Sequence, residues 1–199
     1  MESRRGDIDW KLGRSWALAN LLGWGISVSS AIYVTDLVNG RNGELWIIPA
    51  ALLIGLAQWL VLGRHFSFPG WLIPAYGLGW YIGLWLGWNL GLMAPEPFSL
   101  GAAGGTLVGA IQWLGMRRLL CRSWIWIPTM AISSLLGCWI GVLAGSSAYD
   151  SASIGMVLAY AIGGAVAGAV MGVLSGIVLV ILIRQTAHRK VGITNGVST

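Results

Sequence analysis

The chain has 199 residues, of which 56% are hydrophobic and only 10% are charged, and it contains 30 glycines and 13 tryptophans. This composition is far from that of a soluble globular domain and predicts an integral membrane protein with the lipid bilayer as its main partner. The formal net charge of +5 could suggest an acidic partner, but the placement of the basic residues described below has a simpler cause, so no nucleic-acid partner is expected.

Six apolar stretches are long enough to cross a bilayer, which takes about 20 mostly apolar residues in a helix. In chain order they are residues 15–35, 45–63, 71–93, 99–117, 124–147 and 154–183. Their apolar runs are continuous and lack the alternation of barrel strands, so an all-α membrane protein with six transmembrane helices is expected. We therefore divide the chain into an N-terminal segment 1–14, a transmembrane domain 15–183 and a tail 184–199, which lacks an apolar face and is expected to be disordered.

The basic residues follow the positive-inside rule if the N-terminus is cytoplasmic. The cytoplasmic side then holds every basic residue except Arg41, namely Arg4, Arg5, Lys11, Arg14, Arg64, Arg117, Arg118, Arg122, Arg184, Arg189 and Lys190. The outer loops carry Asp36, Glu44, Glu96 and Asp150, which we interpret as solvated loop residues, with a cation-attracting mouth as the alternative. Both termini are predicted to be cytoplasmic.

The chain resembles itself when it is shifted by 54 residues. The shift carries Gln58-Trp59 onto Gln112-Trp113 and Arg64 onto Arg118. It also carries Pro74 onto Pro128, Trp85 onto Trp139, and Gly83, Gly87 and Gly91 onto Gly137, Gly141 and Gly145. One offset predicts three tandem parallel hairpins of about 54 residues, at about 15–64, 70–118 and 124–183, around a pseudo-threefold axis. The first span belongs to this repeat, so we expect it to be retained rather than cleaved as a signal peptide.

Glycines spaced four residues apart predict where the helices touch. Lipid supplies no hydrophobic force that pairs helices. Helices in a membrane therefore associate through small residues, which let their backbones approach closely. The glycines are Gly79, Gly83, Gly87 and Gly91, then Gly101, Gly105 and Gly109, then Gly137, Gly141 and Gly145, then Gly164, Gly168, Gly172 and Gly176. We expect tight helix packing there; the alternative is a pore lining or room for a flat ligand.

No Asp, Glu, Lys, Arg or His lies in the middle of any predicted span. Ion pumps, proton relays and most coupled transporters need an ionisable group at depth, and acid–base or metal catalysis needs a set of such groups. The sequence therefore predicts a non-enzymatic protein with no catalytic residues and no metal site, and it identifies no cofactor.

Our candidate ligand-binding residues are Gln58, Trp59, Gln112 and Trp113. Gln58 lies six residues before Arg64, about 9 Å along a helix, which places it in the inner leaflet rather than at the midplane. A glutamine there can form a structural tie to a neighbouring helix. The alternative is that the Gln-Trp pairs bind a polar headgroup or a ligand.

The remaining tryptophans fall into two groups by depth. Trp46, Trp71, Trp124 and Trp126 stand where spans start and are interpreted as interfacial anchors. Deeper in the spans are Trp80, Trp85, Trp88 and Trp139. We expect the deeper group to pack against the glycines; the alternative is an aromatic wall for a lipid, a quinone or a pigment.

The run GLAQWLVLGRHFSFPGWLIPAYGLGWYIG at 55–83 resembles the repeated element of a group of uncharacterised bacterial, notably cyanobacterial, multi-pass membrane proteins. Their pattern is G-x-x-Q-W-L-x-L-R, a short basic link, then Trp and a glycine-spaced helix. The resemblance covers 55–91 and 109–145, whereas the third copy has Val166 and Ala167 at the Gln and Trp positions. It implies a membrane location and little else.

These observations favour a scaffold or an accessory subunit of a membrane assembly, with a membrane-protein partner or a second copy of the chain. The expected location is a bacterial inner membrane or a thylakoid membrane. The alternatives are a small channel or facilitator for neutral or apolar solutes, and a binder of lipid, quinone or pigment.

Overall fold

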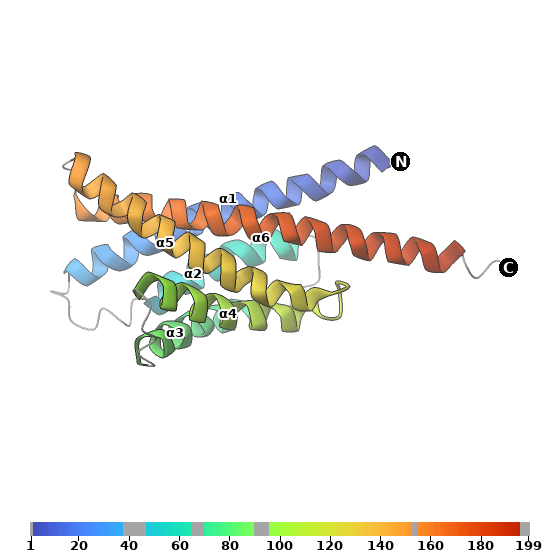
Figure 1. The fold of residues 1–199 in the computed structure, drawn as a ribbon, viewed down its shortest axis with the longest axis horizontal. Helices are drawn as coiled ribbons and strands as arrows, with labels where there is room; N and C mark the ends of the chain where they lie inside the picture. The colour runs from blue at the N-terminus through green and yellow to red at the C-terminus, as the bar shows by residue number, and fades with distance from the viewer. Residues whose placement is uncertain (1, 38–46, 65–69, 90–95, 153–154, 196–199) are drawn as a thin grey trace.

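A computed structural model describes residues 2–37, 47–64, 70–89, 96–152 and 155–195 (Figure 1). These residues are all-helical, without a β-strand among them. The helices are α1 (Glu2–Leu37), α2 (Ile47–Gly63), α3 (Leu72–Asn89), α4 (Glu96–Met116), the short 3₁₀ helix η2 (Ser123–Ile125), α5 (Trp126–Ala152) and α6 (Met156–Asn195).

Four of these helices carry a proline in their first turn. Pro49, Pro74, Pro97 and Pro128 lie in the first turns of α2, α3, α4 and α5. Backbone N–H groups in the first turn have no partner within the helix, so the missing N–H of proline costs nothing there, and its fixed φ suits a helix start. The prolines thus help to explain where these four helices begin.

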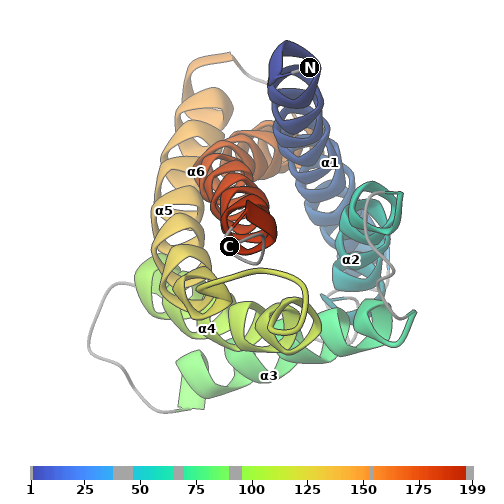
Figure 2. The same ribbon diagram turned by 90° about the vertical axis from the view of Figure 1, so that its right-hand side faces the viewer.

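The six α-helices form a ring in chain order. Each helix packs against the next one along the chain, and α6 packs extensively against α1, which closes the ring (Figure 2). Successive helices run in opposite directions, so the two chain ends lie at the same end of the bundle (Figure 1). The last residues of α2 and α4 and the first residues of α3 and α5 lie at this end too, which we call the basic end because Arg64, Arg117, Arg118 and Arg122 follow α2 and α4 there.

The distribution of polarity is the reverse of that in a soluble domain. Large apolar side chains on every α-helix face outward, among them Leu18, Leu22, Leu60, Leu78, Leu114, Ile132, Leu143, Val173 and Ile177. Buried polar side chains lie inside, among them Asn20, Ser27, Gln58, Gln112, Ser134 and Ser175. An outer surface this apolar is stable in lipid and aggregates in water.

Three helices are long and apolar enough to cross a membrane. They are Trp10–Val34, Ser123–Asp150 and Met156–Ala187, and the shorter apolar helix Ile48–Gly63 accompanies them within the described residues. The chain is therefore an all-helical protein of membrane type.

The first and last helices extend beyond the spans predicted from the sequence. α1 begins at Glu2, so 2–14 continue the first helix, and α6 continues to Asn195, so 184–195 continue the last one. Residues 196–199 lie outside the described residues. Tertiary contacts stabilise the parts of these extensions next to the spans: Leu12 is buried, and the guanidinium carbon of Arg184 lies 5.4 Å from the ring centre of Trp10.

Candidate functional site

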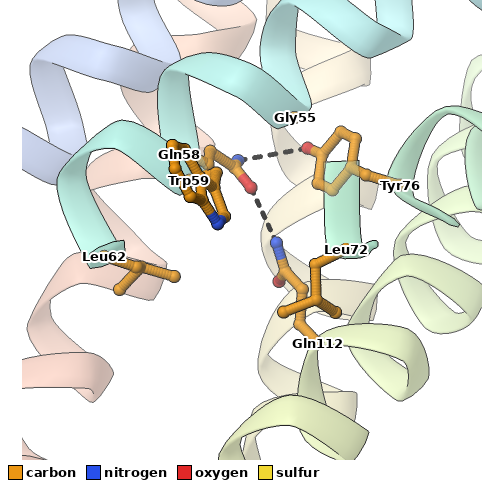
Figure 3. A pocket seen from close by; sticks show the side chains of 7 residues that line it. All are labelled: Gly55, Gln58, Trp59, Leu62, Leu72, Tyr76 and Gln112. Carbon is orange, nitrogen blue, oxygen red and sulfur yellow. Dashed lines mark hydrogen bonds between the residues drawn. The ribbon is translucent and has the colours of Figure 1, made fainter. Parts of the chain in front are cut away.

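Gln58 on α2 lies at the centre of a group of buried hydrogen bonds. Its Nε2 donates to Oδ1 of Asn20 on α1 at 2.7 Å and to the hydroxyl of Tyr76 on α3 at 3.1 Å. Its Oε1 accepts from Nε2 of Gln112 on α4 at 2.6 Å. Figure 3 shows the contacts with Tyr76 and Gln112, which converge on the Gln58 amide from α3 and α4. One amide therefore joins four helices.

The hydrogen bonds extend from this centre to the other two helices. Trp126 on α5 donates from Nε1 to Oε1 of Gln112 at 2.7 Å. Asn20 donates from Nδ2 to the carbonyl oxygen of Trp16 at 2.9 Å, and Trp16 donates from Nε1 to Oγ of Ser175 on α6 at 2.8 Å. We call these side chains the polar cluster: Trp16, Asn20, Gln58, Tyr76, Gln112, Trp126 and Ser175. Each of the six α-helices contributes at least one member, so the cluster fixes the ring from within.

Apolar contacts surround the polar cluster. The rings of Trp16 and Trp126 meet edge to face with centroids 5.8 Å apart. Met116, Met130, Met171 and Leu179 are buried in the same core. This shell lowers the polarity around the amides, which strengthens each hydrogen bond.

A small cavity adjoins the polar cluster. It has a volume of about 20 Å³ and is lined by Gly55, Gln58, Trp59, Leu62, Leu72, Tyr76 and Gln112 (Figure 3). A single water molecule needs about 10–15 Å³ measured in this way. A cavity of this volume has room for one water molecule.

The chemistry that this site can perform is limited. Its polar members are amides, indoles, a serine and a tyrosine, and none of these amides or indoles exchanges a proton near neutral pH. Among the described residues, no group of three or more His, Cys, Asp or Glu side chains could hold a metal ion. What the arrangement can do is hold helices in register and offer hydrogen bonds to one small neutral molecule.

The tryptophans of the two Gln-Trp pairs do not share the position of the glutamines. Trp59 is half-buried and borders the cavity. Trp113 is also half-buried, and the guanidinium carbon of Arg117 lies 5.8 Å from its ring centre. The structure thus brings Gln58 and Gln112 into direct contact and places Trp113 nearer the basic end.

The spaced glycines lie where neighbouring helices meet. A Cβ at Gly83 on α3 would fall against the backbone of Gly104 on α4, and one at Gly101 on α4 would lie 2.7 Å from the carbonyl oxygen of Ser134 on α5. α5 and α6 meet in the same way, since a Cβ at Gly141 on α5 would lie 2.6 Å from the carbonyl oxygen of Gly163 on α6.

Glycines of α6 make the contact with α1 in the same way. A Cβ at Gly168 would meet the backbone of Asn20, and one at Gly172 would lie 2.8 Å from the Cα of Ala17. Further glycines with a neighbouring helix within 4 Å of such a Cβ are Gly79, Gly105, Gly109, Gly137, Gly145, Gly164 and Gly176. The surroundings of Gly87 and Gly91 lie outside the described residues.

Sequence reasoning missed most partners of the two glutamines. Trp126 was interpreted as an interfacial anchor, but it is fully buried and bound to Gln112, so that interpretation is wrong. A tryptophan at the start of a span is expected at the membrane surface. Here the α4–α5 turn and η2 precede α5, and its first residue, Trp126, lies beside Gln112. Asn20 is the one amide of the first predicted span, and this could have marked it as a partner.

The deeper tryptophans also separate in the structure. Trp80 is buried against Gly104, as expected for a packing residue, and its ring lies edge to face with Trp24 at 4.8 Å. Trp85 and Trp139, in contrast, are exposed on the outer surface. The surroundings of Trp88 lie outside the described residues.

Comparison with known proteins assigns no family, since no family model, no curated protein and no solved structure matches the chain.

Proposed function

We propose that this protein is a non-enzymatic integral membrane protein that serves as a scaffold or accessory subunit of a membrane assembly. One observation carries the proposal: polar side chains from all six α-helices bind one another in the interior, while the outer surface is apolar. Such a body is rigid, closed inside and suited to contacts at its outer surface.

The proposal includes six spans arranged as three tandem parallel hairpins of about 54 residues. Its support is the sequence offset together with the ring of helices that alternate in direction (Figure 1, Figure 2). α2, α3 and α4 have 17, 18 and 21 residues, which is within the range that crosses a bilayer core. The proposed location is a bacterial inner or thylakoid membrane with both termini cytoplasmic.

A labelling experiment tests this orientation. With Cys121 and Cys138 replaced by serine, a membrane-impermeant maleimide should label Gly155→Cys in intact cells and label Arg118→Cys only after the membrane is opened. Both positions are exposed and lie at opposite ends of the bundle, and no atom lies within 4 Å of a Cβ at Gly155. The reverse labelling pattern would invert the proposed orientation.

Photo-crosslinking in native membranes tests the scaffold role. A photo-reactive amino acid at Ile132 or Val142, exposed on the outer face of α5, should give discrete crosslinked products of higher mass. The matched control is Met130, two residues from Ile132 on α5 and buried, where crosslinks should remain within the chain. Purification in mild detergent as an isolated monomer, with no crosslinked product at the outer positions, contradicts the scaffold role.

No specific observation supports a solute facilitator or a binder of quinone or pigment. A facilitator needs a continuous path, whereas Trp16, Met116, Trp126, Met130 and Met171 fill the described interior. A pigment or quinone binder needs a larger space than the cavity of about 20 Å³.

A further inference from the structure

The turn between α4 and α5 presents three exposed arginines within six residues. Arg117, Arg118 and Arg122 are all exposed at the basic end of the bundle. An arginine guanidinium presents a planar set of donors that matches the oxygens of a phosphate group better than a lysine ammonium does. The turn thus has the composition of an anion-binding surface.

The turn is held in a fixed shape by its other residues. Leu120 and Ser123 are buried, and the backbone N–H of Cys121 donates to Oγ1 of Thr186 on α6 at 2.9 Å. Arg122 has a φ of 55°, a left-handed conformation that reverses the chain before η2. Because this backbone is already ordered, binding at the turn costs less conformational entropy than binding by a loose loop.

Apolar side chains are exposed next to the arginines. Trp124 is 62% exposed and Leu119 is 37% exposed. The Arg117 guanidinium lies over the ring of Trp113, and tryptophan is enriched where membrane proteins meet the headgroup region. A soluble anion would use only the arginines, whereas a phospholipid brings a phosphate to the arginines and an acyl chain to Trp124 and Leu119.

The electrostatic surroundings favour a negatively charged lipid. Lys11, Arg14 and Arg64 are exposed at the basic end as well. Glu2, Asp7 and Asp9 lie on the first turns of α1 at this end, against eleven of the twelve Lys and Arg residues of the chain, and Asp150 lies near the last residues of α5 at the opposite end. Basic groups near the membrane surface attract anionic lipids additively.

We propose that the α4–α5 turn binds the headgroup phosphate of an anionic phospholipid of the surrounding leaflet through Arg117, Arg118 and Arg122, with Trp124 and Leu119 contacting its glycerol and acyl region. The inference rests on the membrane placement included in the proposed function.

Native mass spectrometry of the full chain tests this proposal. The protein, purified in mild detergent, is titrated with phosphatidylglycerol and with phosphatidylcholine of the same acyl chains, and the retained lipid is counted. The wild-type chain should retain phosphatidylglycerol about tenfold better than phosphatidylcholine or more. The variant Arg117→Gln/Arg118→Gln/Arg122→Gln should lose this preference. An excess of inorganic phosphate should not displace the lipid.

The matched control removes three charges from the same end outside the turn. Lys11→Gln/Arg14→Gln/Arg64→Gln should keep most of the preference, and both triple variants should unfold at the temperature of the wild type. If the glutamine variant of the turn does not fold, Arg117→Lys/Arg118→Lys/Arg122→Lys keeps the charge and should show reduced retention, and Trp124→Gln should reduce it independently.

Several outcomes overturn the proposal. An equal loss of the phosphatidylglycerol preference in the two glutamine triple variants would show a diffuse charge effect and no site at the turn. Full retention of phosphatidylglycerol by both the lysine variant and the Trp124 variant would show the same. Displacement by inorganic phosphate would show a free-anion site. A protein that needs detergent for extraction but shows no lipid preference leaves the membrane placement intact and removes only this inference.

Discussion

Replacing Gln58 with leucine should lower the free energy of unfolding by about 2 kcal/mol, because three buried hydrogen bonds disappear at about 0.6 kcal/mol each and up to about 1.7 in the best cases. Leucine has a similar volume, so the loss reports the hydrogen bonds rather than a cavity. Asn20, Tyr76 and Gln112 each lose a partner. The measurement is unfolding by sodium dodecyl sulfate in mixed micelles, followed by tryptophan fluorescence.

A double-mutant cycle makes this result specific to the pair of glutamines. Gln112→Leu should cost about 1 kcal/mol through the bonds to Gln58 and Trp126. The double variant should be destabilised by less than the sum of the two single effects, because the hydrogen bond of 2.6 Å between Gln58 and Gln112 is lost in both single variants. Leu60→Ala, exposed on α2, is the control and should change stability by less than about 0.5 kcal/mol. Unchanged stability in Gln58→Leu would remove the structural-tie interpretation.

Gly83→Ala should destabilise the protein by about 1–2 kcal/mol despite the better helix propensity of alanine. The added methyl group would fall against the backbone of Gly104, which cannot turn aside as a flexible side chain does, so α3 and α4 must separate. Overpacking of this kind costs about 1–3 kcal/mol, and the propensity gain of up to about 1 kcal/mol offsets part of it. Gly141→Ala should behave alike, since its Cβ would lie 2.6 Å from the Gly163 oxygen and 2.7 Å from the Cβ of Ala167.

Gly63→Ala is the matched control for the glycine series. Gly63 lies in the last turn of α2, and a Cβ there would come no closer than 3.6 Å to the Trp59 ring. This is an ordinary contact distance, so the variant should be neutral or slightly stabilised. Thermal unfolding in detergent compares the three variants with the wild type. Equal destabilisation of Gly63→Ala and Gly83→Ala would mean that helix contacts do not decide the effect.

The buried amides Gln58 and Gln112 show which features of the site can be predicted from the sequence and which cannot. The offset of 54 residues singled out Gln58 and Gln112 as a related pair, and the short distance from Gln58 to Arg64 along the helix predicted a place in the inner leaflet. The sequence did not show that the two side chains form a hydrogen bond with each other, because that depends on how α2 and α4 are each rotated about their own axes. The hydrogen bonds of Tyr76, Trp126 and Ser175 could not be predicted either, because the local sequence around each residue does not say which helix its side chain faces.

The sequence by itself determined the membrane character, the helical structure and the spaced glycines, because each follows from local composition and from the period of one helix. Only the tertiary structure decided three other features: the closure of the ring by α1 and α6, the burial of Trp126, and the joining of all six α-helices through one polar cluster. These depend on rotations and tilts between helices, which are set by the contacts among all of them at once. A buried amide has a stable place only after every neighbouring helix has supplied its donor or acceptor.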